Sequence, residues 1–123
     1  KSIFIVNTPF IQLLLKNDAN VNEKDNSGNS PLMRAAYMNH LDIAKLLLTN
    51  GSYINAKNNE GYTALMLSID IGRIDIAELL LENGANVNGK NNEGNTALMI
   101  AKNNGYSRFV NLLKKYCKFT KKI

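Results

Sequence analysis

Hydrophobic residues recur along this chain in short blocks with helical spacing. In LDIAKLLL at 41–48 the apolar side chains form one broad stripe of a helix, and IDIAELLL at 74–81 repeats that stripe. A shorter apolar block precedes each of these, PLMRAA at 31–36 and ALMLSI at 64–69, and ALMIAK follows at 97–102. Segments rich in asparagine and glycine separate the pairs of blocks. The pattern predicts pairs of short helices joined by polar turns.

The blocks repeat with a constant period. The hexapeptides GNSPLM, GYTALM and GNTALM begin at Gly28, Gly61 and Gly94, which are 33 residues apart. Residues 28–60 and 61–93 align without a gap and are identical at 16 of 33 positions. Self-similarity at a period of this length is typical of a stacked array of structural units.

The period also predicts where the units begin and end. The hydrophobic content of 45% is enough for a core, and 123 residues are enough for one domain of ordinary size. We expect a single domain over 1–123, made of a partial repeat at 1–27, full repeats at 28–60 and 61–93, and a C-terminal capping repeat at 94–123.

Residue types that begin and end helices stand at equivalent places in the units. A hydroxyl side chain can accept a hydrogen bond from a free backbone N–H at a helix start. Glycine and asparagine tolerate the left-handed conformation that ends a helix. The predicted N-caps are Ser30, Thr63 and Thr96, and the first helices are expected to end near Asn39, Gly72 and Gly105.

These motifs resemble the ankyrin repeat. Its unit has 33 residues and a T-P-L-H-x-A start, which SPLMRAA, TALMLSI and TALMIAK approximate. The longer blocks HLDIAKLLLTNGSYIN and RIDIAELLLENGANVN agree with the rest of the unit, and the resemblance covers about residues 8–117. It implies an all-α solenoid of stacked helix-turn-helix units with short β-turn-like tips.

One departure from the family pattern changes an expectation about stability. Met33, Met66 and Met99 stand where the family usually has a histidine that bonds backbone groups of its own and the next repeat. We therefore expect weaker polar ties between repeats and more reliance on packing. The 20 asparagines of the chain are interpreted as a compositional habit.

The charge of the chain is concentrated at one end. Residues 1–113 contain 10 basic and 10 acidic side chains, so the net charge of +5 comes from the tail. That tail carries Lys114, Lys115, Lys118, Lys121 and Lys122. We interpret these lysines as the polar outer surface of a capping repeat. The alternative is that a basic tail binds nucleic acid or an acidic surface.

No residue pattern points to catalysis, a metal or a cofactor. The single histidine, His40, stands at the start of a second helix, and Cys117 has no nearby histidine or glycine-rich helix start to activate it. One cysteine excludes an internal disulfide and fits a reducing compartment, so a cytoplasmic location is favoured over that of a secreted effector. No apolar run approaches the length of a membrane span.

Binding is the remaining class of function. A solenoid buries its framework between neighbours, so positions that differ from repeat to repeat are available to a partner. The resemblance implies that contacts lie on the concave face and turn tips. The candidate partner-binding residues are Asn26, Ser27, Asn29, Tyr37, Met38, Asn59, Glu60, Tyr62, Ile69, Asp70, Asn92, Glu93, Asn95, Lys102 and Asn103.

The sequence thus predicts a non-catalytic protein–protein interaction module with an unknown protein partner. We expect a monomer with no small-molecule substrate, and nucleic acid is disfavoured as a partner. Two alternatives to this module stay open: the basic-tail function, and an accessory domain of a larger enzyme or effector. The second is considered because we expect the chain to be a fragment that begins partway through a repeat and lacks an initiator methionine.

Overall fold

The computed structural model describes residues 12–13, 15–17 and 20–120. Most of the predicted partial repeat at 1–27, and the side chains of Lys118, Lys121 and Lys122, lie outside this part. The described helices with assigned bounds are α2 (Pro31–Tyr37), α3 (Leu41–Thr49), α4 (Ala64–Asp70), α5 (Ile74–Glu82), α6 (Ala97–Asn103) and α7 (Ser107–Thr120). The described residues contain no strand, which confirms the all-α expectation.

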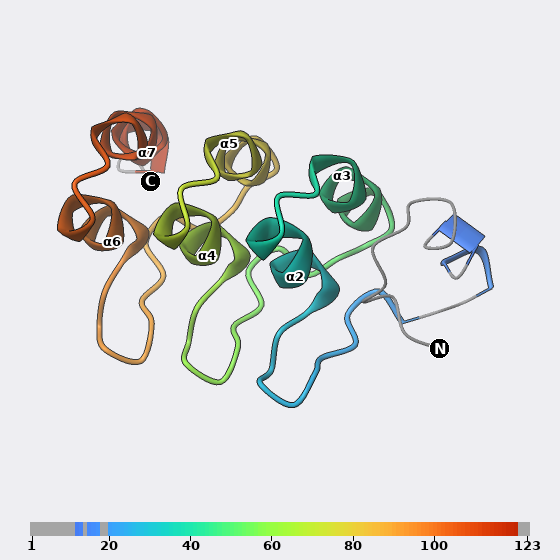
Figure 1. The fold of residues 1–123 in the computed structure, drawn as a ribbon. Coiled ribbons are helices and arrows are strands. Elements are labelled where there is room, and N and C mark those ends of the chain that lie inside the picture. Colours follow the sequence, from blue (N-terminus) through green and yellow to red (C-terminus); the bar gives the residue numbers. More distant parts are fainter. Residues whose placement is uncertain (1–11, 14, 18–19, 121–123) are drawn as a thin grey trace.

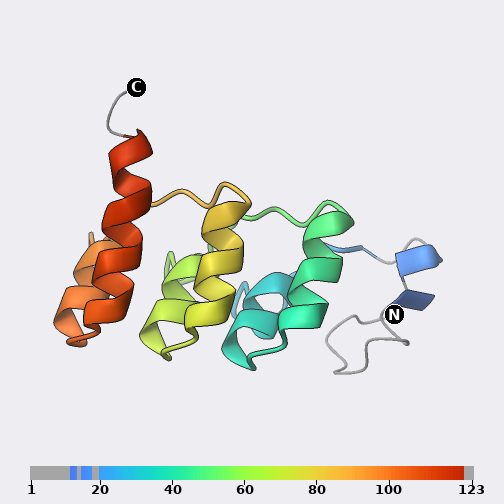
Figure 2. The same cartoon turned by 90° about the horizontal axis from the view of Figure 1, so that it is seen from above.

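The helices form two rows (Figure 1). Helices α2, α4 and α6 lie side by side in one row, and α3, α5 and α7 lie in the other. Each helix of the first row packs against the following helix of the chain, so the units are helical hairpins. Figure 2, which shows the array from above, gives the same order and shows α7 extending beyond the shorter helices of its row.

The apolar stripes predicted from the sequence face one another inside this array. Leu47 of α3 and Leu80 of α5 are fully buried, as are Leu32 of α2 and Leu65 of α4. Buried side chains from all six helices and Val87 form one continuous hydrophobic cluster. Because each unit contributes only part of this cluster, the units depend on one another for a core.

The predicted helix ends are confirmed. Ser30 Oγ accepts a hydrogen bond from the Met33 N–H at 3.3 Å, and Thr63 and Thr96 make the equivalent bonds to Met66 and Met99. The sulfur of Met33 accepts a weak bond from the Ser30 N–H at 3.4 Å, so this methionine does more than fill space. After the helices, Asn39, Gly72 and Gly105 have φ angles of 60°, 77° and 71°.

A turn tip precedes each helix of the first row. Tip 1 (residues 24–29), tip 2 (57–62) and tip 3 (90–95) project from the same side of the array. In tip 2 the Asn58 Oδ1 accepts hydrogen bonds from the backbone N–H groups of Glu60 and Tyr62 at 2.9 and 3.0 Å. Asp25 and Asn91 close the other two tips in the same way. The tips are therefore hydrogen-bonded turns, in agreement with the β-turn-like tips that the resemblance implies.

Neighbouring tips are hydrogen-bonded to each other. The Asn59 N–H donates to the carbonyl oxygen of Ser27 at 3.0 Å, and its Nδ2 donates to the carbonyl oxygen of Asn26 at 3.1 Å. Asn92 makes the same pair of bonds to Glu60 and Asn59, at 3.1 and 2.9 Å. This pair of hydrogen bonds between successive tips is called the asparagine ladder below.

Lysine side chains connect the tips in the opposite direction. The Lys24 Nζ donates to the carbonyl oxygen of Lys57 at 2.9 Å, and the Lys57 Nζ donates to that of Lys90 at 2.8 Å. The expectation of weaker polar ties between repeats is thus wrong at the tips, because asparagine and lysine side chains supply ties that the methionines cannot. The interpretation of asparagine as a compositional habit is wrong for these positions too.

Two glycines let the tips approach this closely. A Cβ atom on Gly61 would lie 2.5 Å from Asn92 Oδ1 and 2.7 Å from the Asn92 backbone nitrogen. A Cβ on Gly28 would meet Asn59 in the same way, at 2.5 and 2.8 Å. Gly94 has a similar φ angle, 83° against 80°, but a Cβ there would meet nothing within 4 Å. Gly94 is therefore an internal control for the cost of the backbone angle alone.

We expect Gly61→Ala to destabilise the chain more than Gly94→Ala. Both substitutions place alanine in a left-handed conformation, which costs about 1–2 kcal/mol. Gly61→Ala also forces tip 3 away from tip 2, and overpacking of this kind adds about 1–3 kcal/mol. Urea unfolding followed by circular dichroism measures both costs. Equal losses of unfolding free energy would show that the close approach of the tips does not support the stack.

Candidate functional site

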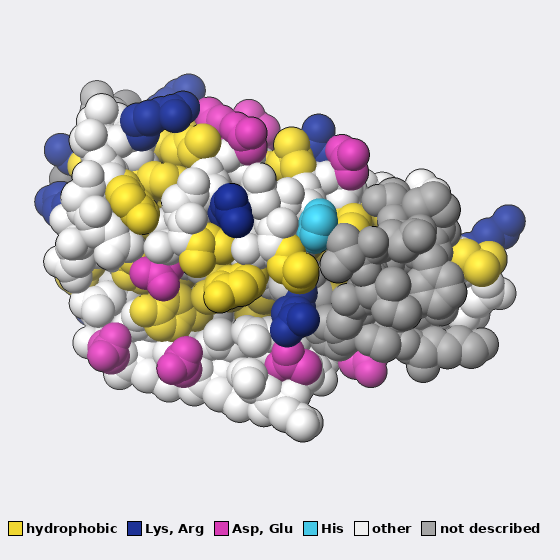
Figure 3. Space-filling model, viewed as in Figure 1, with side chains coloured by type: hydrophobic (Ala, Val, Ile, Leu, Met, Phe, Trp, Pro, Cys, Tyr) yellow, Lys and Arg dark blue, Asp and Glu magenta, His cyan; other side chains and the backbone are white. Residues whose placement is uncertain are grey.

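The exposed side of α2, α4 and α6, together with the tips, carries most of the side chains that comparison of the repeats identified. Figure 3 shows a band of hydrophobic side chains across this side, with acidic side chains spaced along its lower edge over the tips. Tyr37 is 58% exposed and Met38 is 44% exposed. Large apolar side chains with this exposure, next to one another at the end of α2, are typical of contact surfaces.

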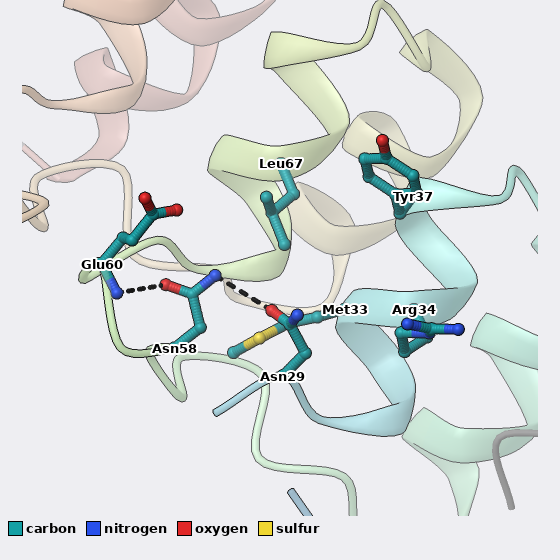
Figure 4. Close-up of a pocket in the computed structure, with 7 residues that line it drawn as sticks. All are labelled: Asn29, Met33, Arg34, Tyr37, Asn58, Glu60 and Leu67. Atoms are coloured by element: carbon teal, nitrogen blue, oxygen red, sulfur yellow. Dashed lines mark hydrogen bonds between the residues drawn. The ribbon is translucent and has the colours of Figure 1, made fainter. Parts of the chain in front are cut away.

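A groove of about 370 Å³ opens between α2, α4 and tip 2. Figure 4 shows Tyr37 and Arg34 on the α2 side, Leu67 on α4, and Asn29, Asn58 and Glu60 on the tips. Met33, which is 1% exposed, also lines the groove. The groove therefore has an apolar base, an aromatic wall and a polar rim.

Hydrogen bonds hold the rim of the groove in place. The Asn58 Nδ2 donates to Asn29 Oδ1 at 2.9 Å, which joins tip 1 to tip 2 beside the opening. The same Asn58 side chain accepts the Glu60 N–H, so the backbone that carries Glu60 is held as well. The shape of the groove is thus determined by the tips before any partner arrives.

One charge at the groove is paired within the chain. Arg34 lies 3.9 Å from an Asp25 carboxylate oxygen, and the two side chains are 47% and 28% exposed. At this separation and exposure the pair contributes little to stability. It does direct the positive charge of Arg34 towards tip 1, while Glu60 lies on the opposite rim.

Tyr62 lies between tips 2 and 3 in a negative environment. It is half-buried, and its ring packs against the hydrophobic cluster. Burial raises the pKa of the Tyr62 hydroxyl above its ordinary value, and the charges of Asp70, Glu93 and Glu60 raise it further. A hydrogen bond with the Asn91 side chain acts in the opposite direction on this pKa.

The structure brings part of the predicted site together. Asn29, Tyr37 and Glu60 line the groove, and Met38 is exposed beside Tyr37. Ser27, Asp70 and Glu93 are exposed at the tips or at the end of α4. Lys102 and Asn103 are exposed at the end of α6 and Asn95 is half-buried, and none of these three lines the groove.

Ile69 was expected on the contact surface, and the structure contradicts this. Its side chain is 0% exposed and belongs to the core. The equivalent positions of the three repeats hold Ala36, Ile69 and Lys102, and this variation predicted an exposed side chain. In the middle repeat, however, the isoleucine side chain packs into the hydrophobic cluster formed with the neighbouring helices.

Asn26, Asn59 and Asn92 have a role in stacking that the sequence comparison did not assign to them. They were grouped with the variable tips, but asparagine occupies this position in every tip and the ladder uses it. Asn59 and Asn92 each bind the preceding tip through the side chain and the backbone N–H, and the Asn26 carbonyl oxygen accepts one of these bonds. These residues therefore have a role in stacking, although all three are exposed. Their identity across the repeats was the signal of a stacking role.

Sequence reasoning missed four residues that line the groove, and these are Met33, Arg34, Asn58 and Leu67. The signal for two of them was present, because the repeats carry Arg34, Leu67 and Ile100 at one equivalent position. A position that holds a charged residue in one repeat and an apolar residue in the others cannot make the same stacking contact in every repeat. Nothing in the sequence pattern indicated that the methionine and asparagine positions reach the same groove.

Among the described residues, no group of three His, Cys, Asp or Glu side chains is arranged to hold a metal ion. His40 caps α3 without a side-chain hydrogen bond to the helix. In that same part of the chain, no helix has the length and hydrophobicity needed to cross a membrane.

Comparison with known protein families agrees with the geometry. The family model described as "Ankyrin repeats (3 copies)" matches residues 3–58 and 50–123. None of the curated proteins compared with the chain matches it. Because the family model covers nearly the whole chain, the chain belongs to the ankyrin-repeat family.

We expect Tyr62 to titrate above the ordinary tyrosine pKa of about 10. A folded-state pKa above the unfolded value means that the unfolded chain loses this proton first as the pH rises. The stability contributed by Tyr62 is complete below the unfolded pKa and is lost as the pH rises through the folded pKa. Carbon-13 NMR of the tyrosine rings measures the pKa, with Tyr62→Phe identifying the signal. Titration of Tyr62 at or below the ordinary value would contradict the negative environment.

Proposed function

Since the chain is an ankyrin-repeat protein, we propose that it binds a protein partner across the groove between α2, α4 and tip 2. Ankyrin repeats are in general protein–protein interaction modules, and the fold is in general a non-enzymatic scaffold. The single observation that supports this place is the groove itself, with the buried Met33 at its base and the exposed Tyr37 as its wall.

The composition of the groove suits a protein ligand. Tyrosine is enriched at interfaces because its ring buries a large apolar area while the hydroxyl keeps a polar partner. Met33 and Leu67 supply a surface that an apolar side chain can cover, and Asn29 and Asn58 supply polar groups at the rim. A segment of protein chain has both kinds of group in close succession.

Pre-organisation also favours binding at this place. The groove residues come from two helices and from tips that are hydrogen-bonded to each other. Few groups have to be ordered when a partner arrives, so the entropic cost of binding is low.

A second candidate function rests on α7. This 14-residue helix contains Arg108, Lys114 and Lys115 and no acidic residue. Lys114 and Lys115 are exposed. A surface of this charge suits nucleic acid or an acidic protein, and counterion release would make such binding fall steeply with salt.

We expect Tyr37→Ala to weaken partner binding about ten-fold or more, as the loss of an aromatic anchor does. Tyr53→Ala is the matched control, because Tyr53 is 68% exposed and does not line the groove. Both variants should keep the helicity of the parent chain. The measurement is affinity capture with quantitative mass spectrometry, using the three chains at low and moderate salt.

If the parent chain and the Tyr37→Ala variant captured the same partner equally well, the binding surface would lie elsewhere on the chain. If the captured material were nucleic acid and were released by moderate salt, α7 would be the binding element instead.

A further inference from the structure

We propose that the groove between α2, α4 and tip 2 takes an aromatic side chain of the protein partner, which fills it as Tyr62 fills the equivalent place one unit further along the array. This inference rests on the proposed function, and it adds the chemistry of the group that the partner inserts.

The groove belongs to the first of two interfaces that have the same construction. The first interface lies between α2 and α4 beside tip 2, and the second lies between α4 and α6 beside tip 3. Asn58 closes tip 2 and Asn91 closes tip 3, each with the same two backbone hydrogen bonds. Every residue that lines the groove therefore has a counterpart 33 positions later in the chain.

The counterpart of Asn29 is Tyr62, and this difference changes the second interface. The Tyr62 ring packs against the hydrophobic cluster, and its hydroxyl is hydrogen-bonded to the Asn91 side chain. The shorter Asn29 accepts a 2.9 Å bond from the Asn58 Nδ2 but has no ring to cover the apolar surface beside it. The place that a ring occupies at the second interface is thus open at the first.

The burial of the surrounding side chains shows the same difference. Leu67 and Asn58, which line the groove, are half-buried. Their counterparts at the second interface, Ile100 and Asn91, are each 5% exposed. The same framework of two helices and a tip is therefore closed around a tyrosine ring at the second interface, whereas it keeps a groove at the first.

The lining of the groove favours a ring over an aliphatic side chain. The exposed Tyr37 forms one wall, and aromatic pairs attract each other beyond the area that they bury. The Met33 thioether at the base can contact the edge of a ring. A cavity of about 150 Å³ is enough for benzene. The volume of about 370 Å³ here leaves room for the larger aromatic side chains.

The chain itself provides a substitution that closes the groove from within. Asn29→Tyr places at the first interface the residue that the second interface already has. The matched control is Asn95→Tyr, because Asn95 is the next counterpart, 33 positions after Tyr62. Asn95 is half-buried and does not line the groove. Both variants add the same ring at equivalent positions of the repeat, and the groove is filled in the first alone.

The experiment is selection of random dodecapeptides displayed on phage against the immobilised full chain. Calorimetry then measures the affinity of the enriched peptides for the parent chain, Asn29→Tyr, Asn95→Tyr and Tyr37→Ala. Each aromatic residue of a peptide is also replaced by leucine, a test that does not depend on how a variant of the chain folds. Circular dichroism and urea unfolding check the fold of every variant.

We expect the enriched peptides to carry a tyrosine, phenylalanine or tryptophan. Replacing it by leucine should lower the affinity at least about ten-fold, as expected for the loss of an aromatic anchor. Asn29→Tyr should lower the affinity by a similar factor, and Asn95→Tyr should leave it unchanged. Peptides that lack an aromatic residue, or that bind equally well after the replacement by leucine, would overturn this inference.

The design separates this inference from the proposed function. If the peptides lose affinity with Tyr37→Ala and Asn29→Tyr but tolerate leucine, the groove is a binding site and its aromatic occupant is wrong. If no peptide is enriched, or if the parent chain and these two variants bind equally, the groove proposal fails and the inference fails with it. If Asn29→Tyr does not fold, Tyr37→Ala decides the first question and the leucine replacements decide the second.

Discussion

The close approach of successive tips is the constraint on which the rest of the structure depends. Gly61 leaves the space that Asn92 fills, and Gly28 leaves the space for Asn59. The asparagine then donates both its backbone N–H and its Nδ2 to the preceding tip. This two-point attachment determines how each unit sits on the one before, and the apolar stripes of the helices meet in the register that it allows.

The candidate binding surface is a consequence of that register. The groove combines residues of tip 1, tip 2, α2 and α4, which lie up to 38 residues apart between Asn29 and Leu67. The surroundings of Tyr62 likewise combine tip 2, tip 3 and the end of α4. Neither exists within a single unit, so the stacking that stabilises the fold also assembles the surface. A partner that spans two units would contact this combined surface rather than any one helix.

The sequence predicted the architecture well because its signals are local and repeated. The caps Ser30, Thr63 and Thr96, and the left-handed ends at Asn39, Gly72 and Gly105, depend only on neighbouring residues. The site was harder to predict because exposure depends on what lies opposite. Ile69 varies between repeats and is nevertheless buried, whereas Asn59 appears at a polar tip and yet binds the neighbouring one. Variation at equivalent positions shows that the residues make no contact common to all repeats, but it does not show that their side chains are exposed.

The most direct test of the ladder is amide hydrogen exchange measured by NMR on the unmodified chain. The N–H groups of Asn59 and Asn92 donate to the preceding tips, whereas that of Asn26 donates to no described residue. If the ladder determines the register, Asn59 and Asn92 should exchange together with the core amides of α4, and Asn26 should exchange fast. Fast exchange at all three asparagines, with α4 still protected, would contradict the account, because the helices would then stack without help from the tips.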